Sequence, residues 1–314
     1  MTLLTGFKHL REAGILGINR RNAEIIMAYN PRAHFPRVDN KIITKELATR
    51  HHIPTPTLHG VISKHGDVRK FDTMIEGLNS FALKPARGSG GSGIVLVRGT
   101  AAQSFITTSG RAIQRADLLY HITDILSGIF SLEGLEDSAI IEALLNPDTV
   151  FEAVSYRGVP DIRIVVYRGV PLMAMVRLPT SASDGKANLH GGAIGAGIDI
   201  KTGHTGTAVH KNNVVKVHPD TGNPVDGIAI PRWETMLLMA AGSWEMTGLG
   251  YIGADLVIDR DRGPLLLELN ARPGLTIQMA NRAGLSDRIN KVNNAPSGIF
   301  EHPGKRVQWA RDNL

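Results

Sequence analysis

A polar trio interrupts two apolar runs between Tyr251 and Gly274. The runs GADLVID and PLLLELN, joined by the charged turn RDRG, predict the two antiparallel strands of a hairpin. Asp255 lies in the first run, whereas Glu268 and Asn270 lie near the end of the second, where strand alternation places both on one face. Oxygen ligands that converge on one face suit Mg²⁺. An ordinary salt bridge between Glu268 and Arg272 is the alternative.

The stretch KPARGSGGSG, residues 84–93, is the second segment that could do chemistry. Its glycines would let backbone N–H groups approach phosphate oxygens. A Rossmann fingerprint needs a helix after its glycines and a Walker A loop needs Gly-Lys-Ser/Thr, but here the apolar run IVLVR follows. This order predicts a flexible hairpin that folds over phosphates, with Lys84 at its base. A surface hairpin without a ligand is the alternative.

Length and composition favour a globular protein and exclude several kinds of site. The chain has 314 residues, of which 42% are hydrophobic and 20% charged, and it has no cysteine. Disulfides, thiolate nucleophiles and cysteine-ligated zinc are therefore excluded. A net charge of +6 admits a nucleic-acid partner, but the basic residues are scattered and only 5% of residues are aromatic, which argues against one. An anionic small substrate explains the positive charge more simply. No apolar stretch approaches membrane-spanning length, so we expect no membrane span and a cytoplasmic location.

The elements that must position these residues alternate between helices and strands. The pattern predicts two short helices within residues 7–30 and a helix over 39–52, capped by Asp39 or Asn40. The other expected elements are FALKPA, GIVLVR, ADLLYHITDILSGIF, AIIEALL, DIRIVVYRGVPLMAMVRL and a helix from Pro231 to about Gly248. The last thirty or so residues are polar and poorly periodic, and we expect them to form a tail that wraps the core.

ELNARPG, taken with the upstream Asp255, resembles the metal-binding signature of the ATP-grasp superfamily of carboxylate–amine ligases. Its wording is most similar to RimK-like enzymes and, within them, to the alpha-L-glutamate ligase-like proteins. The resemblance covers about residues 39–282 and implies an α+β ATP-grasp fold, in which two α/β subdomains hold ATP between them. It also implies two Mg²⁺ ions, or Mn²⁺ in their place, bound by Asp255, Glu268 and Asn270.

The resemblance further implies a set of ATP contacts. Lys41 and Lys84 would reach the phosphates, although Lys41 taken alone fits a solvated first-turn residue better. Residues 142–145 would form the hinge that binds adenine. Asp161 of the DIR triplet would bind the ribose, with Glu152 as its rival because a long insert separates the triplet from this hinge. The complete ATP-binding set is Lys41, Lys84, Gly88, Ser89, Gly90, Gly91, Glu142, Ala143, Leu144, Leu145, Asp161, Lys186 and Asn188.

Two further groups of residues are implied on the substrate side. The loop TSASDGKANLHGG resembles a loop that lines the ATP and substrate side in RimK-like proteins, which makes Lys186 and Asn188 candidate contacts. His190 in the same loop could equally be a structural histidine. The candidate catalytic residues, which would hold a carboxylate or stabilise an oxyanion, are Arg272, Arg177 and Arg163.

The implied domain order has four segments. They are a short N-terminal helical extension (1–38), a first ATP-grasp subdomain with the glycine-rich flap and hinge (39–145), a second subdomain with the metal site (146–285) and a tail (286–314). RimK-like enzymes usually carry a full N-terminal pre-grasp domain, whereas only 40 residues precede Lys41. We therefore expect the substrate site to be completed by a homo-oligomer, by a partner protein or by the chain's own ends. Arg20, Arg21 and Asn22 are candidates, although ordinary scattered surface charge is the alternative that the sequence favours for them.

The resulting functional prediction is an ATP- and Mg²⁺-dependent ligase. It would phosphorylate a carboxylate of a small molecule or peptide, release ADP, and join the acyl group to glutamate or another amino acid. An ATP-grasp kinase acting on a small molecule, or a nucleotide-binding subunit of a larger assembly, are the alternatives. The NLHGG loop favours the ligase over the kinase, and the intact metal set argues against the non-catalytic subunit.

Overall fold

The computed structural model of the chain describes residues 9–10, 12–88, 90–101, 104–131 and 134–314. The chain divides into two compact units, which we describe separately. The large unit comprises Met1–Asp39, Glu46–Pro54 and Pro147–Leu314, and the small unit comprises Asn40–Lys45 and Thr55–Asn146. None of the described helices is long and apolar enough to cross a membrane.

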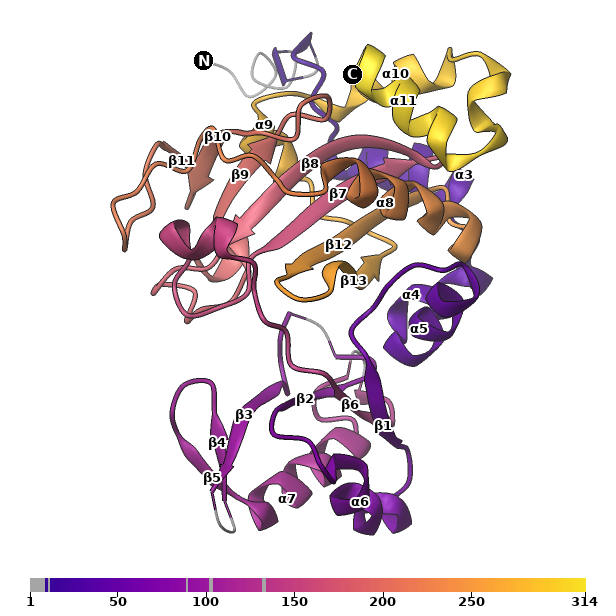
Figure 1. Cartoon of the computed structure of the whole chain (residues 1–314). Coiled ribbons are helices and arrows are strands. Elements are labelled where there is room, and N and C mark those ends of the chain that lie inside the picture. Colours follow the sequence, from indigo (N-terminus) through magenta and orange to yellow (C-terminus); the bar gives the residue numbers. More distant parts are fainter. Residues whose placement is uncertain (1–8, 11, 89, 102–103, 132–133) are drawn as a thin grey trace. The chain divides into compact units, whose positions relative to one another are not determined.

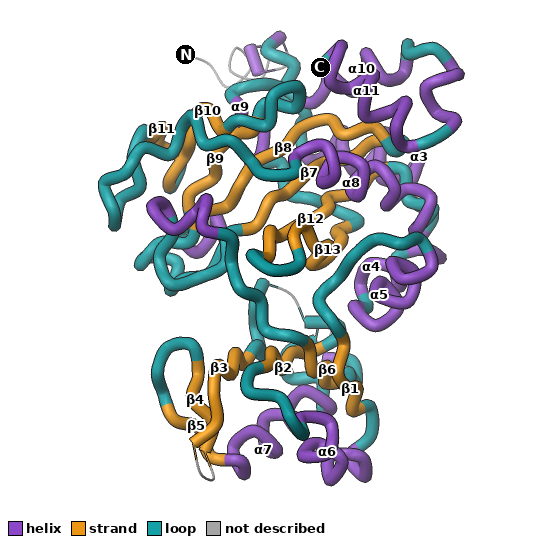
Figure 2. Tube along the Cα trace, viewed as in Figure 1, coloured by secondary structure: helices purple, strands orange, loops and turns teal. Residues whose placement is uncertain are grey.

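The small unit is built on an antiparallel sheet in which the described residues form six strands, in the order β1-β6-β2-β3-β4-β5 (Figure 1). The strands are β1 (Leu58–Ile62), β2 (Phe81–Pro85), β3 (Val95–Ala101), β4 (Ser104–Thr107), β5 (Ala112–Gln114) and β6 (Ala139–Glu142). Helices α6 (Phe71–Ile75) and α7 (Arg115–Leu126) pack against this sheet (Figure 2). Edge-to-face contacts among Phe71, Phe81 and Phe105, with ring centroids 5.8–6.3 Å apart, fill the core between them.

Two predicted features of the small unit are present. The glycine-rich stretch connects β2 to β3, which pair antiparallel, as expected for a hairpin. Helix α5 (Lys41–Arg50) begins where the side chain of Asn40 accepts a hydrogen bond from the N–H of Ile42 at 2.9 Å. Asn40, and not Asp39, is therefore the residue that caps this helix.

The large unit is built on a second antiparallel sheet, in which the described residues form seven strands in the order β11-β10-β9-β8-β7-β12-β13. The strands are β7 (Asp161–Tyr167), β8 (Val170–Leu178), β9 (Ile194–Ile198), β10 (Thr205–His210), β11 (Asn213–Val215), β12 (Tyr251–Asp259) and β13 (Gly263–Asn270). The helices are α2 (Ile18–Arg20), the π-helical turn Arg21–Ile26, α3 (Met27–Tyr29), α4 (Pro36–Asp39), α8 (Trp233–Thr247), α9 (Ile277–Asn281), α10 (Leu285–Asn293) and α11 (Pro303–Asn313). Helix α8 packs against β7, β8 and β12, and α9 packs against β8, β9 and β10.

The C-terminal residues form helices α10 and α11, which corrects the expectation of an irregular tail. Helix α11 is anchored by Arg306, which is fully buried, donates to the carbonyl oxygen of Gly169 at 3.0 Å and pairs with Glu245 on α8. Its planar guanidinium also lies over the ring of Trp244. A buried arginine looks like a surface residue in a sequence pattern, and this is why the apolar side of α11 has no clear period.

The N-terminal helical segment is joined to the β12–β13 hairpin by one buried side chain. The amide nitrogen of Asn30 donates to the carbonyl oxygens of Tyr251, at 2.8 Å, and Ala271, at 3.0 Å. Its amide oxygen accepts from the N–H of Tyr251 at 2.8 Å. Asn30 therefore links the start of β12 to the residue that follows β13.

We expect Asn30→Ala to lower the free energy of unfolding by about 2–3 kcal/mol, because it leaves buried backbone groups without a partner. The measurement is a urea titration at pH 7 with Asn290→Ala as the control. Asn290 is exposed on α10, and its replacement should change the stability by no more than about 0.5 kcal/mol. Equal effects of the two variants would show that Asn30 does not fasten the N-terminal segment.

Candidate functional site

Strands β8, β7, β12 and β13 are neighbours in the sheet of the large unit (Figure 1). Together they carry a group of charged side chains that are buried or partly buried. The register places Asp255 of β12 opposite Arg163 of β7 on one side and opposite Glu268 of β13 on the other. It also places Asp161 opposite Arg177 of β8. A bulge at Leu267 interrupts the β12–β13 pairing directly beside Asp255, so the apolar alternation of the strands is broken where the polar groups gather.

Two arginines bind the two aspartates in a continuous network. Arg163 donates from Nε and Nη2 to the two carboxylate oxygens of Asp255, at 2.7 and 2.5 Å. Arg177 makes the same two-bonded contact with Asp161, at 2.5 and 2.6 Å. Its Nη2 also donates to Asp255 Oδ2 at 2.8 Å, so Arg177 joins the two ion pairs. Bidentate pairs of this kind fix both orientation and charge.

Burial and charge pull the pKa values of the two aspartates in opposite directions. Burial alone would raise the pKa of Asp255, but Arg163 and Arg177 hold it well below its ordinary range. Burial raises the pKa of Asp161 to about 6, although Arg177 opposes the shift, and the neighbouring charge of Asp255 adds to it. Asp255 is thus kept ionised, and Asp161 is the aspartate of this network that takes up a proton first.

The residues predicted to bind metal lie together at the end of the hairpin. The amide nitrogen of Asn270 lies 3.2 Å from Asp255 Oδ2 and 3.5 Å from Glu268 Oε1. Asp255 and Glu268 are within hydrogen-bonding reach of each other, an approach that is favourable only with a proton or a cation between them. The described residues contain no group of three or more His, Cys, Asp or Glu that could hold a metal ion. Two carboxylates and an amide nevertheless fit Mg²⁺, which takes its remaining ligands from water and phosphate.

The small unit contains a second buried cluster, centred on Glu142 of β6. One oxygen of this carboxylate lies 2.5 Å from Lys84 Nζ on β2, and the other lies 2.9 Å from Lys45 Nζ on α5. Burial alone would raise the pKa of Glu142, but the two ammonium groups hold it below its ordinary value. Two cations therefore meet one anion, and the cluster keeps a positive excess that suits a phosphate or another anion.

The glycine-rich hairpin is tied to the same unit at its base. Lys41 donates from its backbone to the carbonyl oxygen of Ala86 at 2.9 Å and from Nζ to that of Gly88 at 2.7 Å. The backbone N–H of Arg87 is bound by the carboxylate of Asp137. Gly90 and Gly91 have positive φ values of 63° and 79°, conformations in which residues with a side chain are strained. Ser89, which belongs to the predicted set, lies outside the described residues.

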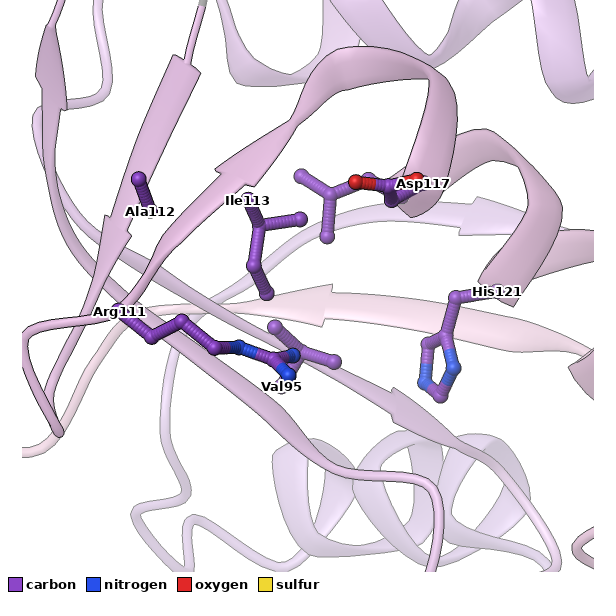
Figure 3. A pocket seen from close by; sticks show the side chains of 7 residues that line it. Val95, Arg111, Ala112, Ile113, Asp117 and His121 are labelled. Carbon is purple, nitrogen blue, oxygen red and sulfur yellow. The ribbon is translucent and has the colours of Figure 1, made fainter.

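A pocket of about 300 Å³ lies beside the start of β3, where the glycine-rich stretch ends (Figure 3). It is lined by Val95, Arg111, Ala112, Ile113, Asp117, Leu118 and His121, none of which belongs to the predicted set. His121 approaches from α7, and its Nε2 lies 2.8 Å from the carbonyl oxygen of Gly93 (Figure 3). The ring of Phe130, 5.1 Å from that of His121, fills the space beside Gly93. These contacts fix the point where the glycine stretch enters β3.

Other predicted residues make different contacts. Arg272 is exposed, with its guanidinium 5.2 Å from the ring centroid of Phe35. Lys186 and His190 are exposed, and the side chain of Asn188 accepts a hydrogen bond from the backbone of His190 at 3.0 Å. Glu152, the rival for the ribose, is on the surface and pairs with Arg260 at 2.6 Å. The hinge residues Ala143, Leu144 and Leu145 continue the chain beyond β6, and Ala143 donates to the carbonyl oxygen of Thr57.

Lys45, in the cluster around Glu142, was not predicted from the sequence. Its side chain is buried and contacts Glu142 and the carbonyl oxygen of Pro56. A usable signal was present, because Lys41 and Lys45 are four positions apart on α5 and therefore share one face of the helix.

Comparison with known proteins identifies the family. The sequence matches the sugar-transfer associated ATP-grasp family over residues 20–294, and the chain belongs to this family. The predicted ATP-grasp fold and membership of the ATP-grasp superfamily are thereby confirmed. No curated protein matches the sequence.

Several solved structures are similar to the chain at low identity. The ATP-grasp ligase PsnB in complex with a minimal precursor is 14% identical with a TM-score of 0.45; the match covers 85% of this chain but only 64% of that chain, less than two thirds of its length. A RimK domain ATP-grasp protein from Sphaerobacter thermophilus is 12% identical over 83% of this chain and 69% of that chain, also with a TM-score of 0.45. The D-alanine–D-alanine ligase from Bacillus anthracis complexed with ATP is 13% identical over 90% of this chain and 69% of that chain, with the same TM-score of 0.45. At these identities and TM-scores the similarity carries no information on substrates.

We expect Glu142→Gln to lower the free energy of unfolding by about 3–5 kcal/mol at pH 7, because it leaves two buried ammonium groups without their carboxylate. The folded pKa of Glu142 is depressed, so its contribution is complete above the unfolded value and is lost as the pH falls through the folded value. The difference between wild type and variant should therefore shrink below about pH 4. Urea midpoints measured from pH 3 to pH 7 test this, with the exposed Glu136→Gln as control. A difference that does not change with pH would contradict it.

Proposed function

We propose that this member of the sugar-transfer associated ATP-grasp family is an ATP- and Mg²⁺-dependent carboxylate–amine ligase. It would transfer the γ-phosphoryl group of ATP to a carboxylate and then form an amide bond to an amine. The observation that carries the proposal is the convergence of Asp255, Glu268 and Asn270, from two paired strands, beside the paired guanidinium groups of Arg163 and Arg177. Family membership supplies the nucleotide side of the argument.

The two steps make different demands on the protein. In the first, a carboxylate oxygen of the acceptor attacks the γ-phosphorus and ADP leaves, which requires alignment and neutralisation of charge. In the second, the amine attacks the acyl carbon, loses a proton, and inorganic phosphate leaves. Bound Mg²⁺ supplies positive charge to the phosphates. Asp255, Glu268 and Asn270 would hold it.

Arg163 and Arg177 act, in this proposal, mainly by keeping Asp255 ionised and oriented. Both guanidinium groups are already paired with buried carboxylates, so little of their charge is left for a substrate. Arg272 is the exposed arginine of the predicted catalytic set and is the better candidate to meet a substrate anion. This divides the three arginines into two positioning residues and one candidate for direct contact.

The ATP-binding roles follow the same reasoning. Lys41 and Lys84, with the backbone of Gly88, Gly90 and Gly91, would contact phosphates, and Lys45 supports Lys84 through Glu142. The segment from Glu142 to Leu145 would bind adenine. Asp161 remains the proposed ribose acid with Glu152 as its rival, and Lys186 and Asn188 remain proposed contacts to phosphate or substrate. We propose glutamate or another amino acid as the amine, and a carboxylate on a small molecule or peptide as the acceptor.

We expect Glu268→Gln to lose at least about a hundredfold in turnover while keeping a cooperative unfolding transition, because one charged metal ligand is removed without a change in size. The assay follows ADP and phosphate from ATP and Mg²⁺ with a panel of amino acids, short peptides and small carboxylates. Glu234→Gln is the control, since Glu234 is an exposed residue paired with Arg311. Wild-type turnover in Glu268→Gln would refute the metal assignment.

The products of the same assay separate the proposed reaction from its rivals. ADP, phosphate and an amide product support the ligase. AMP would indicate adenylation and contradict the acyl-phosphate route. ADP with a phosphorylated hydroxyl group would indicate a kinase, and the absence of turnover with ATP bound would indicate a nucleotide-binding subunit.

A further inference from the structure

Arg21 is a buried cation for which the described residues provide no carboxylate. Its exposed fraction is 7%, and among the described residues its guanidinium donates only to neutral acceptors. The preceding residue behaves in the opposite way, because Arg20 is exposed and pairs with Glu24 at 2.7 Å. Burial lowers the pKa of Arg21; the phenol of Tyr251 counteracts this, and the nearby charge of Arg272 adds to it. A buried charge without a counter-charge is costly. Packing alone therefore does not explain why an arginine occupies position 21.

Two donors of the Arg21 guanidinium share one acceptor. Its Nη1 donates to the carbonyl oxygen of Pro273 at 2.8 Å, which fixes the group beside the ELNARPG segment. Its Nε and Nη2 both donate to the same atom, Oδ1 of Asn22, at 3.1 and 2.8 Å. The Nε–Nη2 edge is the one that matches the two oxygens of a carboxylate. Here a single neutral oxygen occupies it, and that oxygen belongs to an exposed side chain that can turn away.

A second observation points to the same place. The hydroxyl oxygen of Tyr251 is buried and has no hydrogen-bond partner among the described residues. Tyr251 itself is fully buried and interacts electrostatically with Arg21. A buried hydroxyl without a partner costs free energy, and it is rare unless an ordered water or a ligand supplies the missing bond.

The local backbone is also uncommon. Residues Arg21–Ile26 form a π-helical turn between α2 and α3. Such turns are rare and recur at functional sites because they re-aim the side chains that they carry. Asn30, at the end of the same segment, binds the backbone of Tyr251 and Ala271, so the turn is held against the end of the metal hairpin.

We propose that Arg21 and Tyr251 form an anchoring site for a carboxylate group of the substrate. The carboxylate would displace the side chain of Asn22, accept hydrogen bonds from Nε and Nη2 of Arg21 and accept a hydrogen bond from the hydroxyl group of Tyr251. This inference rests on the proposed function, to which it adds an acidic substrate bound through the N-terminal segment. The substrate is thus a small molecule or peptide that carries a free carboxylate next to its reacting group.

Binding is tested without ATP or Mg²⁺, so its outcome is independent of turnover. The probe is glutarate, compared with sodium chloride at equal ionic strength and with the uncharged glutaramide, and the readout is the Tm of the full chain. We expect a saturable rise in Tm with glutarate alone. Tyr251→Phe and Arg21→Lys should each raise the half-saturating glutarate concentration by about tenfold or more, because each removes a hydrogen bond to a charged group. Arg260→Lys, a surface arginine, is the matched control and should respond as wild type does.

Tyr251→Phe keeps the test decisive even if Arg21→Lys does not fold. It removes only a hydroxyl that has no partner, so a purely structural role predicts an unchanged or higher Tm and unchanged glutarate binding. Asn22→Asp provides the converse. A built-in carboxylate on the Nε–Nη2 edge should raise the Tm in the absence of probe and abolish the response to glutarate.

Either of two results overturns the proposal: no saturable response in wild type, or a response that Tyr251→Phe retains at the wild-type half-saturating concentration. The two proposals fail separately. Glutarate binding without any ligase turnover would contradict the proposed reaction and leave the anchoring site intact. Ligase turnover in a protein whose Arg21 and Tyr251 variants bind glutarate normally would contradict only the anchoring site.

Discussion

The carboxylate of Asp255 imposes the constraint on which the large unit depends. A fully buried ionised group is tolerated only when opposite charges reach it, and here Arg163 and Arg177 come from β7 and β8 by virtue of the sheet order and register. The same pairing sets Glu268 and Asn270 beside it on β13. Counting Asp161, Asp255 and Glu268 against two guanidinium groups leaves an excess of negative charge when all are ionised. The cluster must then take up either a proton or a cation.

The buried cluster of the small unit has an imbalance of charge of the opposite sign. Glu142 is one carboxylate between the ammonium groups of Lys84 and Lys45, so its cluster is left with positive charge. One buried cluster is therefore suited to a metal cation and the other to an anion such as a phosphate. Reactions of nucleoside triphosphates need both kinds of site, and each unit satisfies one of the requirements from its own residues. This complementarity supports the proposed chemistry more strongly than any single residue does.

Much of this could be predicted from sequence, because the relevant signals are local. The hairpin of β12 and β13, the glycine loop between two strands and the face shared by Glu268 and Asn270 all follow from alternation and turn chemistry. The partners of Asp255 could not be predicted, since Arg163 and Arg177 reach it only through strand order. The helix of the last residues was missed because its anchor, Arg306, is polar. Lys45 was missed because a lysine on a short helix normally faces solvent.

The partners of Arg306, Arg163, Arg177 and Arg21 distinguish a structural cation from one that could bind a ligand. Arg306, Arg163 and Arg177 each have a carboxylate partner, and each joins two elements of the fold. Arg21 is also buried, yet its partners in the described residues are an amide and a carbonyl oxygen. Both kinds of arginine hold elements together, so packing alone does not separate them. Charge balance does, because a fold that needed only a link at Arg21 could have used a neutral donor at lower cost.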